Sequence, residues 1–342
     1  MLSPQDFIHA MPKCELHVHL EGTLEAEMKF VLAERNGIEL PYADAASLKA
    51  AYAFHDLPSF LKVYYEGMQV LLTERDFYEL CHAYLKKARS QNILYAEMFF
   101  DPQAHTSRGV AFDSIVRGIH QAQVDAEREL GIRSQLIMCF LRELSADDAM
   151  STLEQSLAYK DWIVGVGLDS DERGNPPAKF LSVFARARQE GYRLTMHCDV
   201  NQENTHEHIR QAIAEVGVER VDHGVNLLDD PALIAMAKAR DLSFTLCPLA
   251  NQSVLLRDAQ QPVRRMLDLG LRATINSDDP AYMQGLYLAE NFGMAQRELG
   301  LSNAELHTLS RNAFEAAWLP RSDRNRYLAT LDDFAQSALA TT

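Results

Sequence analysis

The sequence lacks the features that mark secreted, membrane-spanning and disulfide-bonded proteins. Its five cysteines are scattered, with no Cys-x-x-Cys pair, and an odd, dispersed set is typical of reduced thiols inside a cell. No uninterrupted apolar stretch is long enough to span a bilayer, and the N-terminus has no basic region followed by an apolar run. These absences predict a soluble cytoplasmic protein that has no membrane partner.

Positive charge is scarce as well. Lys and Arg total 33 against 48 Asp and Glu, so the formal net charge is −15. Because binding to nucleic acid requires a basic surface, we expect no nucleic-acid partner. Hydrophobic residues nevertheless make up 47% of the 342 residues, which is enough to form a sizeable core.

Short apolar runs rich in β-formers alternate with longer amphipathic segments. Eight candidate strands lie at residues 14–19, 93–99, 135–141, 163–168, 192–197, 219–223, 243–247 and 271–276. Because helical sequence follows each strand, the pattern predicts an α/β fold, a (β/α)8 TIM-type barrel formed as one domain over 1–342. An open doubly wound sheet is the alternative, but the glycine-rich nucleotide loop typical of that fold is missing.

Two segments add sequence to the eight strand–helix units of a simple barrel. Residues 38–73 insert helical sequence after the first strand, and residues 281–342 add further helices at the C-terminal end. Segments that follow strands lie over the active-site face of a barrel. The aromatic-rich part at 52–67 is therefore expected to form either a lid or pocket wall, or an ordinary packed helical hairpin.

The first candidate strand carries two histidines on one face. Side chains alternate along a strand, so His17 and His19 point the same way and can grip one metal ion. Two histidines on a polar surface strand would show the same pattern. Ligands from other strands must therefore decide between the two interpretations.

Other strand ends do supply such residues. His197 and His223 close the fifth and sixth strands, and Asp278 and Asp279 follow the eighth. Catalytic residues of a barrel lie at these C-terminal ends, so the side chains are expected to converge. Imidazoles with one carboxylate suit Zn²⁺ or a similar divalent ion, which lowers the pKa of a bound water. Cys247 also ends a strand, but the proline after it favours a structural turn over a ligand role.

Taken in chain order, these motifs resemble one known family. The segments 17–22, 221–225 and 276–280, together with His197, are similar to the signature of the adenosine/adenine deaminase family in the amidohydrolase superfamily. The resemblance extends over about 10–320. It implies a (β/α)8 barrel and the hydrolytic loss of ammonia from carbon 6 of a purine.

The resemblance also implies a role for each matching residue. His223 would orient the metal-bound water and take part in proton transfer, and Asp279 would hydrogen-bond the purine at N7. The substrate would be a small purine, and the sequence leaves homo-oligomer formation open. Four residues would hold one Zn²⁺, namely His17, His19, His197 and Asp278.

The chain departs from this family after the fifth strand. Most members follow the strand 5 histidine with Ala-Gly-Glu, whose glutamate protonates purine N1, but here Val200 stands at the glutamate position. Either Asp199 or Glu203 could supply the proton, and we favour Glu203 because it keeps the side-chain length. The third alternative is that no acid stands there and this branch handles a different substrate.

Two positions favour a free purine base over a nucleoside. Nucleoside-deaminating members typically carry an aspartate that meets the ribose where Glu21 stands, and the longer side chain would intrude into that space. Ser170 stands where those members tend to have glycine near purine N3. Both positions, and the segment 99–103, resemble adenine deaminases, so we predict conversion of adenine to hypoxanthine.

Several alternatives to adenine deamination remain. The altered loop after strand 5 is also compatible with N6-substituted adenines that release an alkylamine, and adenosine is a further substrate to consider. A different metal-dependent hydrolase of the superfamily would often use a two-metal site bridged by a lysine, and no lysine ends a candidate strand. An inactive purine-binding protein is the alternative that is not an enzyme.

Overall fold

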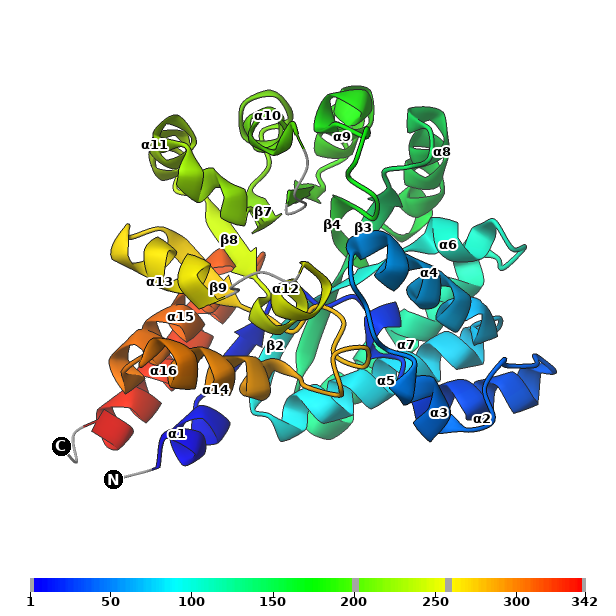
Figure 1. The fold of residues 1–342 in the computed structure, drawn as a ribbon, viewed down its shortest axis with the longest axis horizontal. Coiled ribbons are helices and arrows are strands. Elements are labelled where there is room, and N and C mark those ends of the chain that lie inside the picture. The colour runs from blue at the N-terminus through cyan, green and yellow to red at the C-terminus, as the bar shows by residue number, and fades with distance from the viewer. Residues whose placement is uncertain (1–2, 199–202, 256–259, 340–342) are drawn as a thin grey trace.

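Parallel strands form the centre of the molecule and helices surround them (Figure 1). The computed structural model describes residues 3–198, 203–255 and 260–339. Within these ranges, no helix is long and apolar enough to cross a membrane. The strands are β1 Lys13–Glu15, β2 Ile93–Phe100, β3 Arg133–Leu141, β4 Ile163–Asp169, β5 Arg193–Leu194, β6 His197–Cys198, β7 Arg220–His223, β8 Ser243–Leu246 and β9 Arg272–Ile275.

The strands follow one another in chain order around the centre. One sheet has the order β1-β2-β3-β4-β5 and the other β6-β7-β8-β9, and all neighbours pair in parallel. Residues 193–198 contribute one short strand to each sheet, so the predicted fifth strand is split. On the other side, the amide of His19 donates to the carbonyl of Asp278 at 2.9 Å and joins the ends of the two sheets. This arrangement confirms the predicted (β/α)8 barrel.

Helices occupy the segments between the strands and both additional regions. The α-helices are α1 Pro4–Ala10, α2 Ala26–Asn36, α3 Ala45–Ala50, α4 Leu57–Gly67, α5 Glu74–Ser90, α6 Pro102–Thr106, α7 Phe112–Leu130, α8 Ala146–Ser156, α9 Leu181–Gln189, α10 Thr205–Arg210, α11 Pro231–Ala239, α12 Pro248–Leu255, α13 Gln260–Asp268, α14 Leu288–Leu299, α15 Asn303–Ala316 and α16 Arg321–Leu339.

Local chemistry sets the ends of these helices. α5 begins after Thr73, whose side chain accepts a hydrogen bond from the amide of Asp76 in a capping box. α7 ends at Gly131, whose φ of +68° is the left-handed conformation that glycine adopts most easily. The two helices pack against each other on the outside of β2 and β3. Such short-range signals explain why the alternating pattern was readable from the sequence.

The C-terminal extension closes the bottom of the barrel. Trp318, which follows α15, donates its amide to Glu97 of β2 at 2.6 Å, and its ring lies 4.0 Å from the guanidinium of Arg220. Arg220 in turn forms an ion pair with Glu97 at 2.5 Å, with both side chains buried. A Cβ at Gly165 of β4 would overlap the Trp318 ring, so a side chain there would displace the indole. The first and last helices also meet, with the rings of Phe7 and Phe334 5.1 Å apart.

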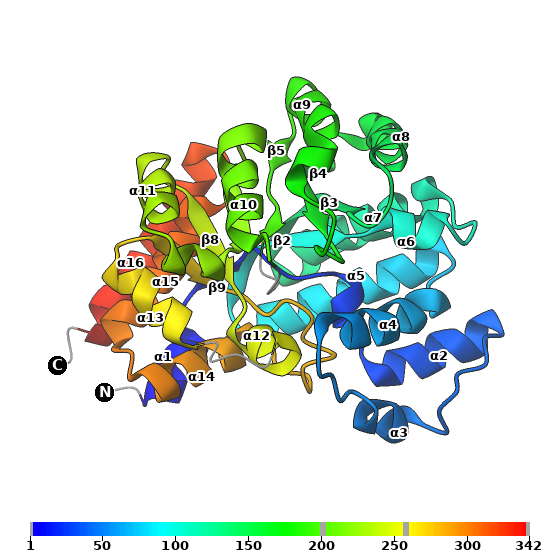
Figure 2. The same ribbon diagram turned by 45° about the horizontal axis from the view of Figure 1, so that its top comes forward.

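Helices α2, α3 and α4 form the predicted insertion, which therefore begins earlier than expected. α4 contacts α12 near the strand ends, as Figure 2 shows. Lys29 of α2 is buried and donates to the hydroxyls of Tyr52 and Tyr282, both at 2.8 Å. Tyr282 belongs to the loop after β9, which also carries Asp279. The Lys29 amine therefore connects the insertion to this loop by a hydrogen bond.

Candidate active site

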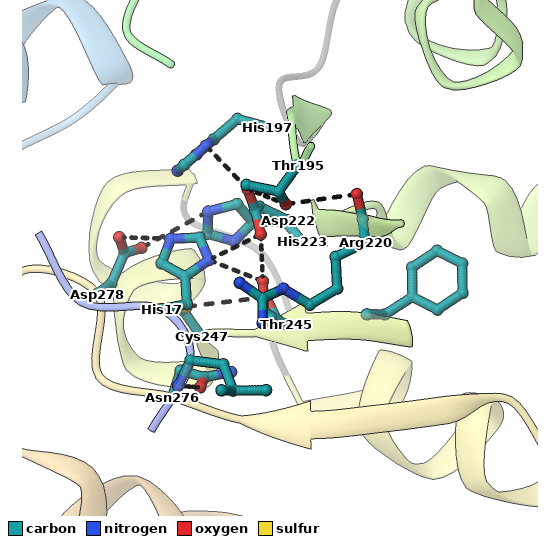
Figure 3. Close-up of polar contacts among 12 residues, drawn as sticks. His17, Thr195, His197, Arg220, Asp222, His223, Thr245, Cys247, Asn276 and Asp278 are labelled. Carbon is teal, nitrogen blue, oxygen red and sulfur yellow. Dashed lines mark hydrogen bonds and ion pairs between the residues drawn. The ribbon is translucent and has the colours of Figure 1, made fainter. Parts of the chain in front are cut away.

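Four of the predicted residues converge at the C-terminal ends of the strands. His17 Nε2 lies 3.2 Å from Asp278 Oδ1, and His19 Nε2 lies 3.4 Å from the same oxygen. His197 Nε2 lies 3.1 Å from His19 Nε2. All four side chains are buried (Figure 3 shows three of them). A fifth predicted residue, His223, joins the same cluster, with Nε2 3.7 Å from Asp278 Oδ2.

The backbone holds these side chains in unusual conformations. His223 and Asp278 both have positive φ values, +57° and +63°, which residues other than glycine rarely adopt. Such backbone strain concentrates at functional sites, where surrounding contacts enforce it. His19 is fixed from both sides, because its segment bridges β2 at Phe99 and the β9 loop at Asp278.

A buried carboxylate behind the cluster fixes the histidine tautomers. Thr195 and Thr245 donate their hydroxyl protons to Asp222 at 2.8 and 2.9 Å. With its proton committed, Thr245 can only accept from His17 Nδ1, which lies 2.8 Å away (Figure 3). The Nε2 lone pair of His17 then faces the cluster. His197 Nδ1 lies 3.5 Å from the same Asp222 carboxylate, an outer contact typical of metal-binding histidines.

The charges in this cluster match what a divalent cation requires. Burial lowers the pKa of His19 to about 4, and burial with the neighbouring His17 lowers that of His197, so both imidazoles are neutral at pH 7. Burial opposes ionisation of Asp278, but the facing His17 lowers its pKa overall. The ligand atoms of His17, His197, His223 and Asp278 lie within 4.8 Å of one another. His19 contacts this group through Asp278, and imidazoles with one carboxylate in this arrangement fit a zinc ion. Cys247 belongs to none of the converging groups among the described residues, and its thiol donates to the carbonyl of Thr245.

The glycine of the first motif makes room for Asp279. A Cβ on Gly22 would fall inside the Asp279 carboxylate, so any larger residue would push that side chain away. Asp279 is buried, and its Oδ1 has no hydrogen-bond partner among the described residues. This carboxylate therefore lies beside the histidine cluster with bonding capacity to spare.

A cavity opens directly above the cluster. One wall is apolar and comes from α4, which confirms that the aromatic segment forms a pocket wall. The rest of the lining is mostly polar and contains three carboxylates outside the predicted ligand set. The lining residues are His19, Leu57, Phe60, Leu61, Tyr64, Tyr65, Asp101, Asp169, Ser170, His197, His223, Ala250, Asn251, Asp278 and Asp279.

The predicted substrate residues are distributed differently. Ser170 lines the cavity, but Glu21 does not. Glu21 is buried behind the wall, where it accepts from the amide of Asp101 at 3.1 Å and pairs with His105 Nε2 at 2.9 Å. Glu203 lies in the turn before α10, with an exposed side chain, and Asp199 lies outside the described residues.

Asp101 and Asp169 are the cavity residues that sequence reasoning missed. Asp101 follows β2 directly and Asp169 ends β4, so both satisfy the strand-end criterion that identified the histidines. Burial raises the pKa of Asp169 to about 7, and burial together with the Asp169 charge raises that of Asp101. Two carboxyls that face each other in this way hold fewer than two charges at neutral pH.

Known proteins of one family match this sequence over nearly its whole length. A family model for adenosine deaminase matches residues 12–334. A deaminase of Schizosaccharomyces pombe is 56% identical over 98% of this chain and 99% of its own. An adenine deaminase of Chlorobium phaeobacteroides is 47% identical over 96% of this chain and 98% of its own.

Two solved structures are similar in fold as well. The crystal structure of an adenine deaminase from Arthrobacter aurescens superposes with a TM-score of 0.92 at 40% identity, over 96% of this chain and 100% of that one. An amidohydrolase from Burkholderia ambifaria with bound Zn has a TM-score of 0.88 at 27% identity, over 99% and 96% of the two chains. The cluster of strand-end histidines and the sequence relationship lead to one assignment: the chain belongs to the adenosine deaminase family of metal-dependent amidohydrolases and is a hydrolytic deaminase.

Proposed function

We propose that this protein is a zinc-dependent adenine deaminase that converts adenine and water to hypoxanthine and ammonia. The observation that carries the proposal is the buried convergence of His17, His19, His197 and Asp278 at the base of the cavity. Relatives that are adenine deaminases, at 44–49% identity, indicate the substrate. We further propose that residues 1–342 act as one catalytic domain.

The four converging side chains would hold one zinc ion. A bound zinc ion supplies a Lewis acid that makes water nucleophilic at neutral pH. Asp222 and Thr245 would keep the His17 tautomer ready for that role, because their hydrogen bonds leave only Nε2 free. Mutation of such outer partners typically costs about 10- to 100-fold in metal affinity or activity.

His223 would move protons rather than bind the ion. It would accept a proton from the attacking water at carbon 6 and deliver one to the departing amine, as general acid–base catalysis requires. Asp279 would hold the purine in register by a hydrogen bond at N7. Both side chains line the cavity next to the cluster, within reach of a substrate placed there.

The acid that protonates N1 would come from the loop after β6. Glu203 and Asp199 remain the two candidates, and we favour Glu203. Its side chain is exposed in this structure, so it would have to swing towards the cavity when substrate binds. Apo geometry does not exclude such a residue, because catalytic hydrogen bonds often tighten only in the complex.

The cavity wall favours a free base. Ser170 lies at the polar side, and Glu21 supports that side from behind Asp101. We propose that Glu21 acts by fixing this wall rather than by touching substrate, which modifies the expectation that it would fill the ribose space. Adenine is then preferred to adenosine.

The test is an ultraviolet assay of the zinc-loaded protein with adenine, N6-methyladenine and adenosine. We expect kcat/KM for adenine to exceed that for adenosine by at least about 100-fold, since a missing or misplaced polar contact costs this much or more. The His17→Ala variant serves as the inactive control. Preference for adenosine, or for N6-methyladenine, over adenine would contradict the proposed substrate.

A further inference from the structure

Arg142, the residue that follows β3, is a fully buried arginine. Among the described residues, its guanidinium donates to backbone carbonyls and pairs with no carboxylate. Nε and Nη2 donate to the carbonyl of Asn175 at 3.0 and 2.9 Å, and Nη1 donates to the carbonyl of His197 at 2.8 Å. Arg220 is equally buried but pairs with the Glu97 carboxylate. Because a buried charge without an ionic partner is costly, the acceptors of Arg142 indicate what it does.

The carbonyl of His197 lies at a gap between the two sheets. β4 pairs with β5, β6 pairs with β7, and the described residues form no ladder between β4 and β6. On the β7 side, the carbonyls of Met196 and Cys198 accept from the amides of Asp222 and Gly224 at 2.9 and 3.1 Å. Successive carbonyls of a strand point in opposite directions, so the carbonyl of His197 faces the gap and needs a donor from elsewhere.

Arg142 supplies that donor, and its own backbone is anchored at the end of β4. The amide of Arg142 donates to the carbonyl of Asp169, the last residue of β4, at 3.2 Å. Lys179 donates to the carbonyl of Arg142 at 2.8 Å and to Asn175 Oδ1 at 3.0 Å, which ties the segments after β3 and β4 together. From this anchored position the side chain reaches across to His197. The guanidinium thus joins the ends of β3, β4 and β6 where the sheet is interrupted.

The side chain of His197 belongs to the proposed zinc site. Its Nε2 lies 3.1 Å from His19 Nε2, and its Nδ1 lies 3.5 Å from the Asp222 carboxylate. β6 is only two residues long, so few backbone hydrogen bonds fix the direction of this imidazole. A metal ligand needs surrounding contacts that hold it in the productive geometry. Resting on the proposed function, we infer that Arg142 is a positioning residue that takes the place of a strand beside β6 and holds His197 ready for zinc.

Two roles for Arg142 make different predictions. If the guanidinium acts through His197, its loss weakens zinc binding only while His197 is itself a ligand. If it merely stabilises the surrounding loops, its loss has the same effect whether or not His197 is present. A double-mutant cycle separates the two roles, because the effects of residues that act together are not additive.

The experiment measures the zinc dissociation constant of each metal-free protein by competition with chelators of graded affinity. Arg142→Met, which removes every donor of the side chain, should weaken zinc binding by about 10- to 100-fold. The same substitution in a His197→Ala protein should change the constant by less than about threefold. The control is Arg188→Met, because the Arg188 guanidinium also donates to backbone carbonyls, those of Val216 and Gly217, but does not line the cavity. Its zinc affinity should stay within about twofold of the wild-type value.

Arg142→Lys provides a second variant in case Arg142→Met does not fold, which circular dichroism of the metal-free protein will show. Lysine keeps the charge but lacks the planar fork that reaches two carbonyls, so zinc binding should weaken by about three- to tenfold, again only when His197 is present. Equal losses in the presence and absence of His197, or wild-type zinc affinity in every folded Arg142 variant, would overturn the inference. A wild-type protein that binds no zinc would instead contradict the proposed zinc site itself.

Discussion

The ammonium group of Lys29 lies 4.0 Å from the centroid of the Tyr282 ring and donates to its hydroxyl. Tyr282 also contacts the carbonyl of Tyr64 on α4, and its amide bonds to the carbonyl of Asp279. Lys29 is thereby the point at which the cavity wall and the catalytic loop are joined. Its burial lowers its pKa to about 7, whereas an exposed lysine titrates near 10.5.

This difference predicts a pH-dependent contribution to stability. Between pH 7.5 and 8.5 the unfolded chain keeps the Lys29 proton and the folded chain loses it, so the stability of the wild-type protein rises with pH relative to Lys29→Met. The expected slope is up to about 1.4 kcal/mol per pH unit. Urea unfolding of both proteins across this window measures it. A difference that is constant with pH would show that the folded lysine stays charged.

Replacing His17 and replacing His223 should affect metal binding differently, although both changes should reduce turnover. His17→Ala should lose zinc and activity together, because it removes one of the converging ligands. His223→Ala should keep about one zinc per chain and lose at least about 10²-fold in kcat, as expected for a proton-transfer residue. Metal analysis and steady-state kinetics decide the matter. A zinc-free His223→Ala protein would identify His223 as a ligand instead.

The strand positions and the metal cluster were predictable because local signals specify them. Alternating apolar runs marked the strands, although β1 ends at Glu15 and not at residue 19 as predicted. His197 lies in β6, whereas His17, His19 and Asp278 follow a strand by two to four residues. Asp101 and Asp169 were not recognised as partners, because their meeting depends on how far β2 and β4 extend into the cavity. The orientation of the Glu21 side chain could not be predicted either, since its partner His105 lies 84 residues away in α6.

The loop after β6 provides a third prediction through a pair of matched substitutions. Asp199→Asn and Glu203→Gln keep the shape of each side chain and remove its ability to act as an acid. One of them, and we expect Glu203→Gln, should reduce kcat for adenine by about 10²-fold or more, while the other should have a mild effect. Wild-type turnover in both variants would place the acid elsewhere in the protein.

The ion pair at the bottom of the barrel should matter for stability and not for chemistry. Glu97→Gln leaves the buried Arg220 charge without its partner and should destabilise the protein by about 3–5 kcal/mol. Urea unfolding measures this cost. The kcat of the fraction that remains folded should be unchanged, because Glu97 is absent from the cavity lining. A selective loss of kcat without loss of stability would contradict this separation.

The position of Trp318 beneath the barrel has a consequence for biosynthesis. Its amide meets Glu97 across 221 residues of chain, so the ribosome must finish most of the protein before the bottom can be sealed. At typical translation rates of about 5–20 residues per second, that interval lasts roughly 10–45 s. During this time the strand β2 is already made but the indole that covers Arg220 and Glu97 does not yet exist. The nascent barrel is therefore exposed to chaperones and proteases from its lower end until the last helices emerge.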